Sequence, residues 1–145
     1  MASKAALTEQ VFADFRRVIA AVVLYNDQVS QQTGISASES QFMHLLALNG
    51  PMTPSELAAQ SGLTSGTVTG VLDRLEKLGF VRRDRHPTDR RKVVVVLEEE
   101  KLAATMGPYY AEQGQALAAV IETFTATELA TVHRFLTALT QSNPA

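Results

Sequence analysis

Hydrophobic residues recur every three or four positions along residues 7–33, which predicts one long amphipathic helix. A second apolar stripe runs beside the first, so this helix is apolar on two sides. The first stripe holds Val11, Phe15, Val18, Val22, Tyr25 and Val29, and the second holds Phe12, Ile19 and Val23. A chain of 145 residues offers little surface to cover both stripes. We therefore expect this helix to pack in a homodimer interface.

The next segments, residues 36–49, 53–62 and 64–78, have the pattern of three shorter helices. Thr53 and Glu56 have the spacing of a capping box, with Pro54 at the first helical position. Gly62 supplies the tight turn before the next helix, which either Thr64 or Ser65 caps. The buried stripe of that helix is predicted to contain Val68, Val71, Leu72, Leu75 and Leu78. A helix-turn-helix is expected.

Two β-type segments follow the helix-turn-helix. Residues 80–85 and 93–97 are predicted strands, and the turn signals of residues 87–92 join them as a hairpin. Two helices followed by a basic hairpin form a winged helix-turn-helix, in which the second helix enters the DNA major groove.

The remaining residues predict two further amphipathic helices, over residues 99–124 and 126–141. The expected fold class is mainly α with a small β-hairpin wing (α+β). We divide the chain into an N-terminal dimerisation helix (1–34), a winged helix-turn-helix DNA-binding domain (35–98) and C-terminal dimerisation helices (99–145).

Charge is distributed unevenly. The whole chain has 13 basic and 15 acidic residues, so its net charge indicates no partner. Residues 73–92, however, contain eight basic and four acidic residues, while the rest of the chain is net acidic. A basic patch on an acidic body is typical of a surface that meets phosphates. A run of charges is often only a solvated surface. Here, however, it falls on the second helix of the helix-turn-helix and on the hairpin.

The candidate DNA-binding residues follow from this arrangement. The exposed face of the second helix would meet the major groove through hydroxyls and an arginine, and its glycines would allow close approach to DNA, although they also weaken the helix. Arg90 is expected to enter the minor groove from the wing tip, and Arg82 or Arg83, but not both, to point towards DNA. The full set is Ser65, Gly66, Thr67, Thr69, Gly70, Arg74, Arg82, Arg90, Arg91 and Lys92.

The run VLDRLEKLGFV at residues 71–81, followed by Asp89-Arg90-Arg91 and a valine-rich strand, resembles the MarR family of bacterial transcriptional regulators. Asp89 and Arg91 match the family's Asp-x-Arg wing signature, and we expect Asp89 to orient an arginine. The resemblance implies a homodimeric regulator, usually a repressor, that binds a palindromic operator in double-stranded DNA. It also implies release by a small, phenolic or aromatic effector, for which the polar-tipped candidates are Tyr25, His44, Tyr109 and Tyr110.

Other classes of function find less support in the sequence. No glycine-rich phosphate loop or nucleophile elbow is present, so we expect no enzyme. The chain has no cysteine, and its histidines do not form metal-ligand pairs, so no metal or cofactor is expected. The apolar run after Arg17 could be mistaken for a secretory signal, but the acidic residues Glu9 and Asp14 precede it and no cleavage site of small residues follows. The run is also too short to span a bilayer, so we expect a cytoplasmic protein. A winged-helix protein-interaction module without DNA binding is the alternative.

Overall fold

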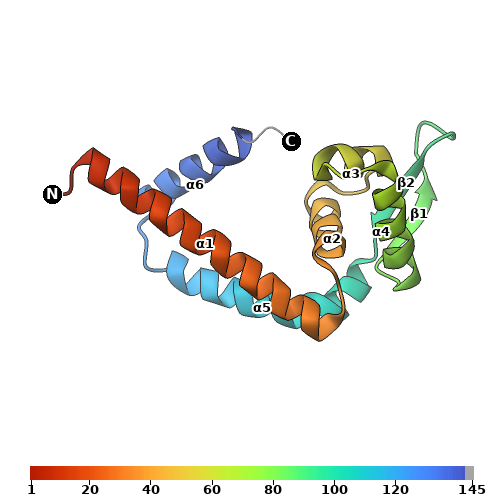
Figure 1. The fold of residues 1–145 in the computed structure, drawn as a ribbon, viewed down its shortest axis with the longest axis horizontal. Coiled ribbons are helices and arrows are strands. Elements are labelled where there is room, and N and C mark those ends of the chain that lie inside the picture. The colour runs from red at the N-terminus through yellow and green to blue at the C-terminus, as the bar shows by residue number, and fades with distance from the viewer. Residues whose placement is uncertain (143–145) are drawn as a thin grey trace. The chain divides into compact units, whose positions relative to one another are not determined.

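A computed structural model describes residues 1–142, and in this part the chain forms six α-helices and one two-stranded antiparallel sheet (Figure 1). The mainly helical fold with a β-hairpin is confirmed. The chain divides into two compact units, Met1–Ser40 and the residues from Gln41 onward, which are described separately below.

Helix α1 (Lys4–Thr33) makes up most of the first unit. It begins three residues earlier than the predicted start at residue 7, because the side chain of Ser3 accepts a hydrogen bond from the backbone N–H of Ala6 and caps the helix. It ends at Gly34 in the left-handed conformation, as predicted. Both apolar stripes contain strongly exposed residues: Val18 of the first stripe is 58% exposed and Phe12 of the second is 62% exposed.

Helix α2 (Ala37–Asn49) crosses the boundary between the two units. Helices α3 (Pro54–Ser61) and α4 (Ser65–Lys77) follow it and form the helix-turn-helix. The predicted capping box of α3 is present: Thr53 accepts from the N–H of Glu56, whose carboxylate accepts from the N–H of Thr53. Thr64, one of the two predicted candidates, caps α4.

The hairpin consists of β1 (Val81–Arg85) and β2 (Val93–Leu97), with Val81 opposite Leu97 and Arg85 opposite Val93. The first strand starts one residue later than predicted, because the N–H of Phe80 donates to the carbonyl of Leu75 and closes the end of α4. An isolated bridge between Met52 and Val95 ties the segment before α3 to the hairpin. We call β1, β2 and their connecting loop the wing.

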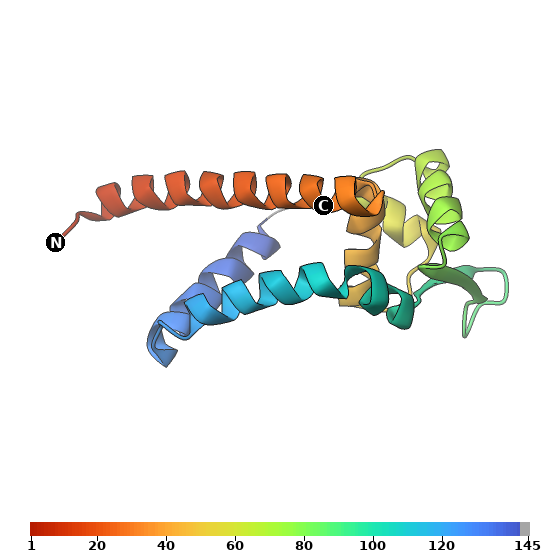
Figure 2. The same cartoon turned by 90° about the horizontal axis from the view of Figure 1, so that it is seen from below.

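The core of the second unit lies where α2, α3, α4 and the hairpin meet (Figure 2). It also receives one side chain from α5 (Glu99–Ile121), whereas α6 (Ala126–Gln141) has no buried residue. The buried apolar side chains of this unit are Phe42, Met43, Leu46, Met52, Leu57, Val68, Leu72, Leu75, Phe80, Val81, Val94, Val95 and Met106. The core therefore fixes the buried side of α4 and leaves its opposite face exposed.

Candidate nucleic-acid interface

The exposed face of α4 carries every residue that the sequence placed there. Of the predicted buried stripe, Val68, Leu72 and Leu75 are buried on the opposite side. Val71 is half-buried, and the prediction was wrong for Leu78, which is exposed at the end of the helix. This amphipathic division sets the orientation of the helix, since turning it would expose the three apolar side chains. All six predicted contacts on α4 are exposed, namely Ser65, Gly66, Thr67, Thr69, Gly70 and Arg74. Asp73, Glu76 and Lys77 are exposed as well.

Gly66 and Gly70 have no packing role within the described chain. A Cβ atom built on either residue would meet no atom within 4 Å, and neither has a positive φ. Both positions would therefore accept alanine without a clash. The two glycines leave a bare helix surface, against which another molecule can approach the backbone closely.

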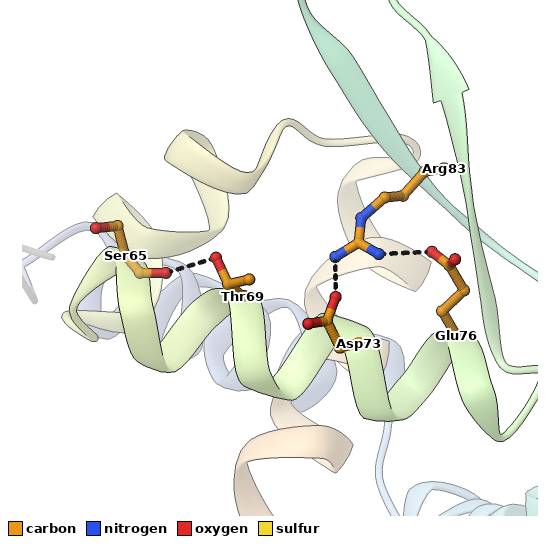
Figure 3. A network of polar contacts seen from close by, with 5 residues as sticks. All are labelled: Ser65, Thr69, Asp73, Glu76 and Arg83. Atoms are coloured by element: carbon orange, nitrogen blue, oxygen red, sulfur yellow. Dashed lines mark hydrogen bonds and ion pairs between the residues drawn. The ribbon is translucent and has the colours of Figure 1, made fainter.

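The threonine hydroxyls of α4 are already engaged within the helix. Thr69 Oγ1 donates to the carbonyl oxygen of Ser65 at 2.9 Å (Figure 3). Thr67 Oγ1 lies 2.9 Å from the hydroxyl oxygen of the capping residue Thr64. A hydroxyl that donates inside the helix keeps an acceptor lone pair for a partner. Thr69 therefore offers a methyl group and an acceptor to its surroundings.

An ion-pair network connects the wing to α4. The guanidinium of Arg83, on β1, lies 2.7 Å from the carboxylate of Asp73 and 2.8 Å from that of Glu76 (Figure 3). The hydrogen bond to Asp73 is the largest cause that raises the pKa of Arg83 above its usual value, while partial burial opposes it. Arg83 is thus a bridge between two elements of the winged domain.

Arg82 points to a different pair of carboxylates. Its guanidinium contacts Glu98 at 3.0 Å and Asp84 at 3.1 Å, and these partners, Glu98 first, raise its pKa. Glu98 directly precedes α5, so Arg82 ties the root of the hairpin to the start of that helix. The DNA contact predicted for Arg82 would have to compete with these two ion pairs, and it stays a prediction.

The loop between the strands, residues 86–92, is ordered by side chains, and we call it the wing turn. His86 Nδ1 lies 3.3 Å from the backbone nitrogen of Thr88 and 3.2 Å from that of Asp89. The Asp89 carboxylate accepts from the backbone N–H of Arg91 at 3.0 Å. Asp89 therefore orients the backbone at Arg91.

The basic side chains at the end of the wing are exposed. Within residues 1–142, the structure records no ion pair for the side chains of Arg90, Arg91 or Lys92. The loop that carries them extends beyond the helices in both views (Figures 1 and 2). The arginines at the root of the wing are thus neutralised by carboxylates, while the cations at its tip are available to an anionic partner.

Two of the effector-site candidates lie together in the second unit. His44 and Tyr110 form an edge-to-face ring pair with centroids 5.5 Å apart. Burial raises the pKa of the half-buried Tyr110, and Tyr109 beside it is also half-buried. Tyr25 belongs to the first unit. The ring pair has a structural explanation in packing α2 against α5, so a ligand site here stays a prediction.

No three or more His, Asp or Glu side chains within residues 1–142 are grouped as metal ligands would be. In the same range, none of the helices combines the length and the apolar content needed to cross a membrane.

Sequence reasoning missed the roles of Arg83 and His86. Because side chains alternate along a strand, Arg82 and Arg83 had to lie on opposite faces of the hairpin. The sequence did not indicate which of the two faces packs against α4. For His86, the available indication was its place before Pro87, which has no N–H. A ring nitrogen at this position can accept from the next two backbone donors, Thr88 and Asp89.

These features define a winged helix-turn-helix protein. Residues 35–93 match the model of the MarR family, so the winged region of the chain is similar to that family. Over 94 residues it is 37% identical to the uncharacterized HTH-type transcriptional regulator YcgE of Bacillus subtilis. This alignment covers 65% of the chain and 61% of YcgE.

Solved structures share the fold over nearly the whole chain. Streptococcus pneumoniae FabT, in complex with DNA, is 23% identical with a TM-score of 0.67, and 96% of each chain is covered. NadR, in complex with 4-hydroxyphenylacetate, is also 23% identical, with a TM-score of 0.69 and coverage of 92% of this chain and 94% of NadR. At this level of identity, the likeness establishes the fold.

Proposed function

We propose that this protein is a sequence-specific double-stranded-DNA-binding transcriptional regulator of MarR type, with no enzymatic activity. The observation that carries the proposal is the combination of a bare, hydroxyl-bearing face on α4 with exposed cations at the end of the wing. The family match over residues 35–93 and the fold shared with DNA-bound FabT support it.

Each element has its own role in this proposal. Helix α4 enters the major groove, where Ser65, Thr67 and Thr69 meet base edges or phosphates and Arg74 meets guanine or phosphate. The absence of side chains at Gly66 and Gly70 brings the helix backbone close to the groove surface.

The wing supplies the electrostatic part of binding. Arg90 enters the minor groove, whose negative potential attracts a guanidinium. Arg91 and Lys92 neutralise phosphates beside it, and these contacts fix the position of the protein on the duplex without reading its sequence.

The active form is a homodimer joined through residues 1–34 and 99–145. The apolar residues exposed on α1 support this, and so do Phe135 and Leu136 on α6, each about half exposed. An exposed apolar stripe as long as that of α1 is rare on a soluble monomer. A two-fold dimer then requires an inverted repeat whose half-sites lie one helical turn, roughly 34 Å, apart.

We further propose that the dimer is a repressor released by a small effector with an aromatic or phenolic ring. The family resemblance suggests this class, and NadR, which shares the fold, binds 4-hydroxyphenylacetate. Tyr25, His44, Tyr109 and Tyr110 are the candidate contacts. A thermal-shift screen against aromatic acids tests this step, and an effector must also lower the affinity for operator DNA.

A salt titration of binding to duplex DNA tests the central proposal. Binding that depends on phosphate contacts weakens steeply as salt rises, with a slope of about 0.9 per phosphate neutralised. The alternative, a winged-helix module that binds only proteins, predicts no binding to duplex at any salt concentration. Footprinting then distinguishes an inverted repeat from a single asymmetric half-site.

A further inference from the structure

The wing turn is held together by two side chains, those of His86 and Asp89, as well as by its backbone. The turn is closed by backbone hydrogen bonds from the N–H of His86 to the carbonyl of Lys92 and from the N–H of Lys92 to the carbonyl of Asp89, both 3.0 Å. These two bonds fasten its ends. The backbone between them is held by the side chains of His86 and Asp89.

His86 Nδ1 is the acceptor for the first half of the turn. It faces the backbone nitrogens of both Thr88 and Asp89, and the hydroxyl oxygen of Thr88 lies 3.3 Å from it. Pro87 has no backbone N–H, so these are the first two donors that the chain offers after His86. The ring is half-buried against the loop.

We propose that His86 is a positioning residue for DNA binding: its Nδ1 holds the wing turn in the form that presents Arg90 and Arg91 to the duplex. This inference rests on the proposed DNA-binding function. His86 itself touches no DNA in this account. It acts through Asp89. The backbone N–H of Asp89 donates to His86 Nδ1, and the Asp89 carboxylate accepts from the backbone N–H of Arg91.

The chemistry of the ring specifies what a substitute must provide. Accepting two N–H groups requires an Nδ1 without a proton, so the neutral ring carries its proton on Nε2. The Oδ1 atom of asparagine stands the same number of bonds from Cα as Nδ1 does, and asparagine forms such turns readily. His86→Asn therefore keeps the acceptor, while His86→Gln places its amide one bond too far and His86→Ala removes it.

The first experiment follows the turn in the absence of DNA. Amide hydrogen exchange of Thr88 and Asp89, measured by NMR, should be faster in His86→Ala and His86→Gln than in the wild type and His86→Asn. The nitrogen chemical shifts of the wild-type ring should report an unprotonated Nδ1. Equal exchange rates in all four proteins, or a proton on Nδ1, would overturn the inference.

The second experiment asks whether His86 acts through the wing arginines. His86→Ala should weaken binding to duplex DNA about tenfold, the equivalent of one or two ordinary hydrogen bonds, and should flatten the salt slope. His86→Asn should restore most of the affinity. In a background of Arg90→Ala with Arg91→Ala, His86→Ala should have little further effect, because the side chains that it positions are gone.

The outcomes separate this inference from the proposed function. If the wild-type protein fails to bind duplex DNA, the proposed function is overturned, whatever the exchange data show. The proposed role of His86 in DNA binding is then overturned as well. Wild-type binding that His86→Ala leaves unchanged would overturn the inference alone. An equal loss in the double-arginine background would also overturn it, since His86 would then act independently of Arg90 and Arg91.

Discussion

Arg83 Nη2 lies 2.7 Å from the Asp73 carboxylate and thereby joins the first strand of the wing to the face of α4 that carries the candidate DNA contacts. Glu76, one helical turn further along α4, holds the second nitrogen of the same guanidinium. One cation therefore pairs with two carboxylates and offsets half of their charge, on a helix that is proposed to approach phosphates. The bridge fixes the wing relative to α4 and reduces the repulsion between these carboxylates and phosphate.

Replacing Arg83 by alanine is expected to lower the free energy of unfolding by about 1 kcal/mol, because partly exposed ion pairs are screened by solvent. It should also weaken DNA binding, since Asp73 and Glu76 would then face phosphate uncompensated. The salt slope should hardly change, because Arg83 touches no phosphate in this account. Urea denaturation and a salt titration measure the two effects.

Arg85→Ala is the matched control for stability. Arg85 lies on the same strand and is exposed, and the structure records no ion pair for it within residues 1–142. Its loss should change the unfolding free energy by less than about 0.5 kcal/mol. Adding Asp73→Asn to Arg83→Ala should recover part of the lost affinity. A reduced salt slope in Arg83→Ala would instead place this arginine on the DNA.

The Arg83 bridge also illustrates what could be predicted from the sequence. Helix α4 and the capping box of α3 were predictable because they depend on residues three or four positions apart, such as Thr53 and Glu56. Residues on β1 and α4 meet only after the hairpin packs on the helix. Strand alternation separated Arg82 from Arg83, but only the packed structure places Arg83 beside Asp73 and Arg82 beside Glu98.

The same distinction holds for the candidate DNA interface. The exposed positions of α4 follow from the helical repeat. The six predicted contacts on this helix, the first of them Ser65 and the last Arg74, are therefore exposed as expected. The wing turn contains no repeating pattern, and its order depends on individual side-chain acceptors. His86 and the backbone role of Asp89 therefore had to come from the structure.

The wing arginines should contribute mainly affinity and only a little sequence preference. Arg90→Ala and Arg91→Ala are each expected to weaken binding to any duplex and to reduce the salt slope by nearly one unit per lost phosphate contact. If Arg90 enters the minor groove, its loss should also reduce a preference for A·T-rich flanks. Salt titrations of all variants in one buffer provide the comparison.

Arg16→Ala removes the same charge from the exposed surface of α1 and serves as the control. Its salt slope should equal that of the wild type. Asp89→Ala should weaken binding although it removes a negative charge, because the backbone at Arg91 loses its acceptor. Wild-type slopes in both wing variants, with the fold intact by circular dichroism, would remove the wing from the interface.

Assembly through the terminal helices predicts that the apolar face of α1 cannot accept charge. Phe12→Glu, at a position that is 62% exposed in the single chain, is expected to shift light scattering from a dimer towards a monomer and to lower thermal stability. Gln10→Glu adds the same charge on the same helix and should leave the dimer intact. A stable, folded monomer of the wild-type chain would contradict the two-sided interpretation of α1.

Thr69 provides a test of sequence reading that involves no charge. Because its hydroxyl donates to the carbonyl of Ser65, the methyl group is a distinctive feature left to contact a base edge, as threonine methyls do with thymine. Thr69→Val keeps a methyl and should retain the preferred operator. Thr69→Ser keeps the hydroxyl without the methyl and, like Thr69→Ala, should lose roughly 1 kcal/mol of discrimination at one base pair of each half-site.

All three variants should keep the wild-type salt slope, since no charge changes. Selection from a randomised operator library, repeated for each variant, identifies the affected position. If Thr69→Ser retained the wild-type preference while Thr69→Val lost it, the hydroxyl would be the reading group, and its bond to Ser65 would have to break on binding.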